Sequence, residues 1–98
     1  MPGLIYESTV GFVIDIEIVG AGSLEGVEKQ KLIVLPPGAT DVEEWDVHSV
    51  VENKVFRHIV APDKPIASGQ YQIQPYFKLG SFEGPWEIVY LDVDRKLK

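Results

Sequence analysis

The 98 residues of the chain include 15 acidic and 9 basic side chains, which give a formal net charge of −6, and 45% of the residues are hydrophobic. This size suits one domain, spanning residues 1–98, that can bury its own core. A surface with this charge repels a phosphate backbone, so we expect no nucleic-acid partner. Cysteine does not occur, which excludes disulfides and thiolate metal sites.

Neither a membrane segment nor an export signal is visible in the sequence. The longest uninterrupted apolar stretch, residues 32–35, stops at two prolines and is far too short to cross a bilayer. Residues 1–7 have neither a basic region nor a long apolar region, so we expect no signal peptide and no membrane partner. The initiating Met1 and the charged tail at residues 94–98 favour a complete small protein.

Alternation of apolar and polar residues predicts strands through the first half of the chain. A short strand covers residues 4–6, and the clearest alternation follows at residues 10–18. Residues 28–35 form the next predicted strand, which stops at the Pro36-Pro37-Gly38 turn. Residues 43–49 alternate again, with Trp45 and Val47 inward. A hairpin turn at residues 52–54 then leads to a returning strand at 55–60.

The second half of the chain predicts a long crossover and two strands. Residues 61–69 hold two prolines and show no periodicity. In the strand that follows, Tyr71, Ile73, Pro75 and Phe77 share one face, and Pro75 predicts a sheet edge or a bulge because proline donates no ladder hydrogen bond. The last strand covers residues 86–93. Short strands without a helical period predict an all-β, antiparallel β-sandwich.

The start of the Tyr71 strand indicates the kind of sandwich. Ser68-Gly69-Gln70-Tyr71-Gln72-Ile73-Gln74 places a small residue and a glycine before a strictly alternating Tyr-x-Ile. An immunoglobulin-like sandwich enters its penultimate strand in this way, with the tyrosine ring inward and its hydroxyl bonded to the backbone of the preceding corner. We therefore expect an immunoglobulin-like sandwich of about seven strands, with Tyr71 as its structural corner.

Two segments could be taken for ligand sites, and a structural role is favoured for both. Residues 20–26 are rich in glycine and follow a strand, but a β-rich segment comes next instead of the helix that a phosphate loop needs. An acidic cluster that could hold Ca²⁺ consists of Asp41, Glu43, Glu44 and Asp46. Alternation turns Glu43 away from Glu44 and Asp46, so a solvated face is favoured.

The two histidines are the remaining candidates for chemistry. His48 and His58 lie on strands that could pair in a hairpin, so their rings could approach each other. Two histidines without a third ligand make a poor zinc site, and no nucleophile accompanies them. The serines lie in no Gly-x-Ser-x-Gly turn. We therefore expect no catalytic residue, no metal site and no cofactor, and no enzyme activity.

The last predicted strand defines a candidate interface. If Val89, Leu91 and Val93 pack inward, the period of two turns the alternate residues outward, beside the outer residues of the Tyr71 strand. The candidate interface residues are Tyr76, Trp86, Ile88, Tyr90, Gln72 and Gln74. An aromatic, glutamine-rich face of low charge suits a protein interface and also a sugar-binding platform. The inverted register, which would place the outward set in the core, stays open.

Six segments in a fixed order carry a family resemblance: Thr9-Val10-Gly11-Phe12-Val13-Ile14, Ser23-Leu24-Glu25-Gly26, Lys31-Leu32-Ile33-Val34, Pro36-Pro37-Gly38 with Glu44-Trp45 after it, residues 68–74, and Glu87-x-Val89-x-Leu91-x-Val93. Over nearly its whole length the chain resembles small immunoglobulin-like proteins encoded among the structural genes of tailed bacteriophages and prophages.

The resemblance implies a non-catalytic component of the virion, assembled in the host cytoplasm. Such a component belongs to the tail, baseplate or fibre, or decorates the head. It docks in many copies, so that weak individual contacts suffice, and its partners are other virion proteins or copies of itself. The alternative function is a carbohydrate-binding or adhesion module that uses Trp86, Tyr90 and Tyr76 as a stacking platform.

Overall fold

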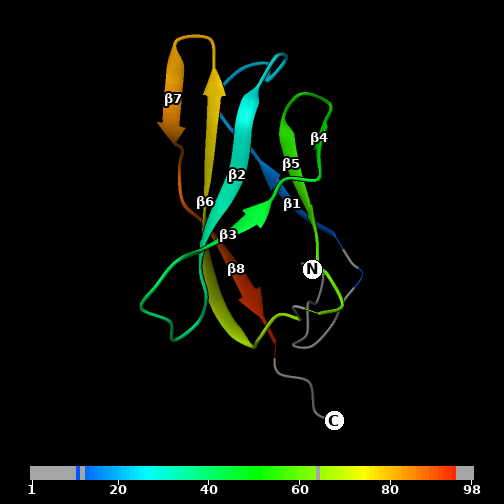
Figure 1. The fold of residues 1–98 in the computed structure, drawn as a ribbon, viewed down its shortest axis with the longest axis vertical. Helices are drawn as coiled ribbons and strands as arrows, with labels where there is room; N and C mark the ends of the chain where they lie inside the picture. Colours follow the sequence, from blue (N-terminus) through cyan, green and yellow to red (C-terminus); the bar gives the residue numbers. More distant parts are fainter. Residues whose placement is uncertain (1–10, 12, 64, 95–98) are drawn as a thin grey trace.

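The computed structural model describes residues 11, 13–63 and 65–94, which form two antiparallel sheets (Figure 1). The strands are β1 (Val13–Glu17), β2 (Glu28–Leu35), β3 (Glu43–Asp46), β4 (Ser49–Val51), β5 (Val55–Ile59), β6 (Gly69–Leu79), β7 (Phe82–Pro85) and β8 (Val89–Val93). In this part of the chain no helix is long and apolar enough to span a membrane. The all-β, antiparallel prediction is confirmed for the described residues. The predicted strand at residues 4–6, with Val10 and Phe12, lies outside them.

Two of the predicted strands are each divided in the structure. The predicted strand at residues 43–49 becomes β3, which pairs with β2, and the first residue of β4, which pairs with β5. The chain therefore changes sheets between Asp46 and Ser49. The predicted strand at residues 86–93 starts only at Val89, and residues 82–85 form β7 before it. The described residues thus hold eight strands.

The long strand β6 organises the larger sheet. The smaller sheet has the order β1-β5-β4, and the larger one has the order β3-β2-β6-β7, with β8 also paired to β6. One edge of β6 pairs with β2. Along the other edge, β8 pairs with the first half of β6 and β7 with the second half, so that Val89 lies opposite Ile73 and Pro85 opposite Tyr76.

The core lies between the two sheets, where alternate side chains point inward. The buried hydrophobic residues are Ile14, Ile16, Ile18, Leu24, Leu32, Val34, Phe56, Val60, Ile66, Tyr71, Ile73, Phe77 and Val93. Phe56 of the smaller sheet and Phe77 of the larger sheet meet edge to face, with ring centroids 5.7 Å apart. Each such side chain contributes roughly 1.5–3 kcal/mol when it is fully buried. The two sheets are therefore held face to face by the inward-pointing side chains, which alternate with outward-pointing ones along each strand.

The hairpin turn predicted at residues 52–54 is present between β4 and β5. Glu52 and Asn53 both have positive φ, 53° and 54°, and the Lys54 amide donates to the Val51 carbonyl at 3.1 Å. Two successive left-handed residues closed by this bond make a type I′ turn, whose twist matches that of the paired strands. The turn fixes the register that brings Ser49 opposite Arg57.

Pro75 lies in the middle of β6 and not at a sheet edge, but the predicted irregularity is present, because residues 74–75 face three residues, 86–88, between the pairs Ile73–Val89 and Tyr76–Pro85. Leu32 of β2 is opposite Pro75 on one side, and on the other side the Pro75 carbonyl accepts a hydrogen bond from the Trp86 amide at 2.8 Å. Because the amide and carbonyl of one strand residue point the same way, the missing amide faces residues 86–88. Pairing passes from β8 to β7 there, so proline costs the sheet no ladder bond.

The corner before β6 is closed by Gly69 and Tyr71. Gly69 has a φ of 120°, and a Cβ on it would lie 2.6 Å from the Cβ of Pro37, so only glycine allows this approach. Tyr71 is only 4% exposed, and its hydroxyl accepts a hydrogen bond from the Ala67 amide at 2.8 Å. The tyrosine thereby satisfies a backbone donor of the crossover, as a sandwich corner requires.

Replacing Tyr71 with phenylalanine should lower the free energy of unfolding by about 1 kcal/mol, the typical net value of one such hydrogen bond. The ring and its packing stay, whereas the Ala67 amide loses its acceptor. Urea denaturation of the two proteins measures the difference. An unchanged midpoint would show that the hydroxyl contributes nothing to the corner.

Candidate functional site

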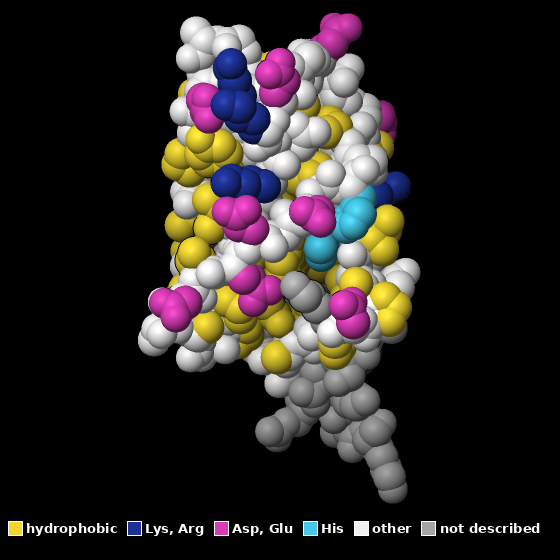
Figure 2. Space-filling model, viewed as in Figure 1, with side chains coloured by type: hydrophobic (Ala, Val, Ile, Leu, Met, Phe, Trp, Pro, Cys, Tyr) yellow, Lys and Arg dark blue, Asp and Glu magenta, His cyan; other side chains and the backbone are white. Residues whose placement is uncertain are grey.

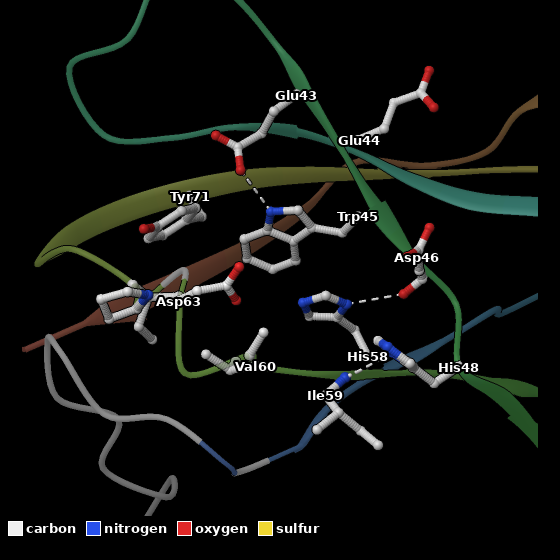
Figure 3. A pocket seen from close by; sticks show the side chains of 13 residues that line it. Glu43, Glu44, Trp45, Asp46, His48, His58, Ile59, Val60, Asp63 and Tyr71 are labelled. Carbon is white, nitrogen blue, oxygen red and sulfur yellow. Dashed lines mark hydrogen bonds between the residues drawn. The ribbon is translucent and has the colours of Figure 1, made fainter.

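A pocket of about 580 Å³ opens between β3 and the end of β5. Its walls come from β3, His48, the end of β5, residues 60, 61, 63, 65 and 66 of the crossover, and Tyr71 of β6 (Figure 3). The pocket forms because the chain leaves the larger sheet after β3 and enters the smaller sheet at β4, which leaves β3 as a free edge next to the crossover. Its volume lies in the range of small-molecule sites, roughly 300–1,000 Å³.

Trp45 is the central side chain of the pocket. Its indole stacks on the His58 ring, with centroids 4.6 Å apart and planes inclined by 16°, and it meets Tyr71 at 5.6 Å in a tilted contact. The indole nitrogen donates a hydrogen bond to Glu43 at 2.8 Å. Two ring contacts and one hydrogen bond therefore hold Trp45 in a single orientation. The inward direction predicted for it agrees with its register opposite buried Leu32.

The two histidines lie beside each other, with ring centroids 5.2 Å apart (Figure 2). The Ile59 amide donates to Nδ1 of His48 at 3.1 Å, and Nδ1 of His58 lies 2.9 Å from the Asp46 carbonyl, to which it donates when protonated. Burial lowers the pKa of His58 below its ordinary value of 6.5, and the neighbouring His48 lowers it further, although the Asp46 carbonyl acts in the opposite direction. His58 is therefore neutral at pH 7.

The acidic cluster predicted from the sequence is divided between two faces of β3. Glu43 lies opposite inward Val34, whereas Glu44 lies opposite Ile33 on the outer face and pairs with Lys31 at 3.2 Å. No group of three or more acidic or histidine residues within the described ranges is arranged to hold a metal ion. The crossover brings Asp63, a residue that the sequence did not single out, to the same pocket as Glu43. Figure 3 shows both carboxylates turned towards Trp45, with Glu44 turned away.

The second candidate surface is the outer face of the larger sheet. Tyr90 lies opposite Gln72, and Leu91 lies opposite buried Tyr71, so Val89, Leu91 and Val93 point inward as predicted. Tyr90 is 59% exposed and Ile88 is 44% exposed. Gln72 is exposed beside them, and Leu35 of β2 lies opposite Gln72 on its other side. The outer face therefore carries apolar side chains from two strands around Gln72.

Tyr76 and Gln74 lie on the same outer face, but both already form contacts with other residues of the chain. The Tyr76 hydroxyl donates to Glu83 at 2.9 Å, and the Lys31 ammonium lies 4.9 Å from the centre of the Tyr76 ring. Gln74 donates its side-chain amide to the Trp86 carbonyl at 2.9 Å. Both residues are half-buried. Of the predicted interface residues, Gln72, Ile88 and Tyr90 are therefore the most available to a partner.

The outward assignment of Trp86 is wrong. Its ring packs on the core residue Phe77 at 5.5 Å and on Phe82 at 5.4 Å, and its indole nitrogen donates to the Val19 carbonyl at 2.9 Å. Val19 follows β1, so Trp86 reaches across to the smaller sheet. The prediction assumed one strand over residues 86–93, but residues 86–88 belong to no strand, and the period of two does not extend from Tyr90 back to Trp86.

Trp86→Ala should therefore lower the free energy of unfolding by about 2 kcal/mol, somewhat less than the 3–5 kcal/mol typical of a fully buried tryptophan. Tyr90→Ala is the matched control, because an exposed side chain can be removed at a cost within about 0.5 kcal/mol. Chemical denaturation of both variants measures the difference. Equal midpoints for the two would contradict the inward position of Trp86.

The stability of the protein should fall as the pH is lowered from 7.5 to 5.5. Because the folded state lowers the pKa of His58, the unfolded chain takes up this proton more readily. The contribution is fully present above pH 6.5 and is lost as the pH falls through that value and through the lower folded-state pKa. The denaturation midpoint of the His58→Gln variant should decline less over this pH interval than the midpoint of the wild type. An equal decline in both proteins would show that His58 is not the group responsible.

No family model, curated protein or solved structure matches the chain. Its two candidate surfaces are therefore interpreted from their own geometry. The pocket is concave and lined by rings and carboxylates, which suits a small ligand or a single side chain. The outer face is a sheet surface with an apolar centre, which suits a protein partner.

Proposed function

We propose that the chain is a non-catalytic interaction module, an immunoglobulin-like structural protein of a tailed-phage particle that docks in many copies on the tail, baseplate, fibre or capsid. The observation that carries the proposal is Tyr90, 59% exposed on the outer face of the larger sheet opposite Gln72, with the exposed Ile88 two residues before it in the chain. Large exposed apolar side chains on a rigid sheet mark an interaction surface. The sequence resemblance supplies the kind of particle.

The composition of the outer face supports a protein partner. Its centre holds Tyr90 and Gln72, with Leu35 on the other side of Gln72 and the exposed Ile88 close to Tyr90 in the chain. Charged residues stand around this centre: Lys31, Glu44, Glu83 and Asp92. An apolar, aromatic centre with a charged rim is the usual anatomy of a protein interface.

The alternative sugar platform is weakened by the position of Trp86. Stacking of a glycan needs rings whose faces are open, but Trp86 packs between Phe77 and Phe82. The Tyr76 ring lies under the Lys31 ammonium. Tyr90 is left as the one exposed aromatic ring of the three. A single ring supports docking of a protein better than binding of an extended sugar chain.

Tyr90→Ala should leave the isolated domain folded and reduce its incorporation into particles. An interface tyrosine at a hot spot contributes about 2 kcal/mol, which is roughly a 30-fold change in affinity for one contact. Many copies on one particle amplify this loss because the contacts act together. The measurement is the ratio of the protein to the major capsid protein in purified particles, by quantitative mass spectrometry.

Val42→Ala is the matched control, because Val42 is 61% exposed and belongs neither to the outer-face centre nor to the pocket lining. The proposal is supported if the Val42→Ala protein is incorporated into particles as the wild type is, whereas the Tyr90→Ala protein is incorporated less. Full incorporation of the Tyr90 variant would show that docking uses another surface. Failure to find the wild-type protein in particles would overturn the virion role itself.

A further inference from the structure

We propose that the pocket between β3 and the crossover binds an alkylammonium group, the cation carried by small amines, by choline-type ligands and by lysine side chains. The inference is independent of the outer face and of the virion role. It rests on the rings of Trp45, His58 and Tyr71 and on the carboxylates of Glu43 and Asp63. All five side chains line the same pocket (Figure 3).

The rings supply the first part of the recognition. Tryptophan is the best of the aromatic side chains for a cation, since its ring presents the most negative face. His58 covers one face of the Trp45 ring, so a cation would approach the ring from its other side. The bond to Glu43 and the stack on His58 hold the indole in place before any ligand arrives, which lowers the entropy lost on binding. Tyr71 is fixed in turn by its hydroxyl bond to the crossover. The aromatic wall is therefore preorganised.

The carboxylates supply the second part. Glu43 and Asp63 approach Trp45 from different elements, β3 and the crossover. The indole uses one oxygen of Glu43, and in the described part of the chain neither Glu43 nor Asp63 forms a salt bridge. No lysine or arginine is among the described residues that line the pocket. An ammonium group in the pocket would be attracted by the negative charges of both carboxylates.

His58 does not oppose a cation at neutral pH. His58 forms the wall on one side of Trp45 and is neutral at pH 7, because burial lowers its pKa. The wall next to Trp45 is thus polar but uncharged, so the carboxylates determine the sign of the potential in the pocket.

The test is a titration of the whole protein at pH 7.5, followed through the Trp45 indole N–H resonance by NMR. Choline and n-butylammonium are the probes for quaternary and primary ammonium groups, and 3,3-dimethylbutan-1-ol is the uncharged isostere of choline. We expect saturable shifts with a dissociation constant on the order of millimolar for at least one cation, and none for the alcohol. Binding of butylammonium alone indicates a lysine-like ligand, and binding of choline alone a quaternary amine.

Glu43→Gln and Asp63→Asn should each weaken cation binding about three- to fivefold, since each removes a charge without changing shape. The matched control is Glu25→Gln, at an exposed position outside the residues that line the pocket, which should bind as the wild type does. Trp45→Leu should weaken binding about tenfold. If the Trp45→Leu variant does not fold, the Glu43→Gln and Asp63→Asn variants test the inference.

Three outcomes would overturn the inference. The first is the lack of a saturable shift with either cation. The second is equal binding of the alcohol, which would make the pocket an apolar site. The third is equal weakening by Glu43→Gln, Asp63→Asn and Glu25→Gln, which would assign the effect to the net negative charge of the protein and not to the pocket.

Discussion

The alternation of side chains along β6 is the constraint on which the rest of the structure depends. Tyr71, Ile73 and Phe77 point into the core, whereas the residues between them form the outer face. Both edges of this strand are paired, with β2 on one side and with β8 and then β7 on the other. A slip of one residue would turn the core side chains of β6 to the outer face and its outer side chains to the core, so this register helps to determine where both candidate surfaces lie.

The break in the sheet at residues 86–88 accommodates three neighbouring features. It faces the missing amide of Pro75, and it frees the Trp86 carbonyl for the side chain of Gln74. It also lets the Trp86 ring turn from the sheet to the Val19 carbonyl. A continuous strand would have placed Trp86 by the period of two and left an unpaired position at Pro75.

The two candidate surfaces lie on opposite faces of the larger sheet and differ in chemistry. Adjacent residues of β3 show this directly, since Glu43 turns to the pocket and Glu44 to the outer face. The pocket presents rings in a concave space, together with two carboxylates that form no salt bridge to any residue the structure describes. The outer face presents exposed apolar side chains with charges around them. A small cation and a protein partner could therefore be bound at the same time without competing for the same residues.

The sequence by itself determined the elements that depend on local physics. The period of two along residues 71–77, the positive-φ turn at Glu52-Asn53 and the glycine before Tyr71 each act over a few residues. Only the tertiary structure decided the division of residues 43–49 and 86–93, because a chain changes sheets or partners in response to distant strands. It also decided the pocket, which joins Trp45, His58 and Asp63 from three separate segments. No local sequence pattern predicts that these residues come together, because their arrangement arises from packing between the sheets.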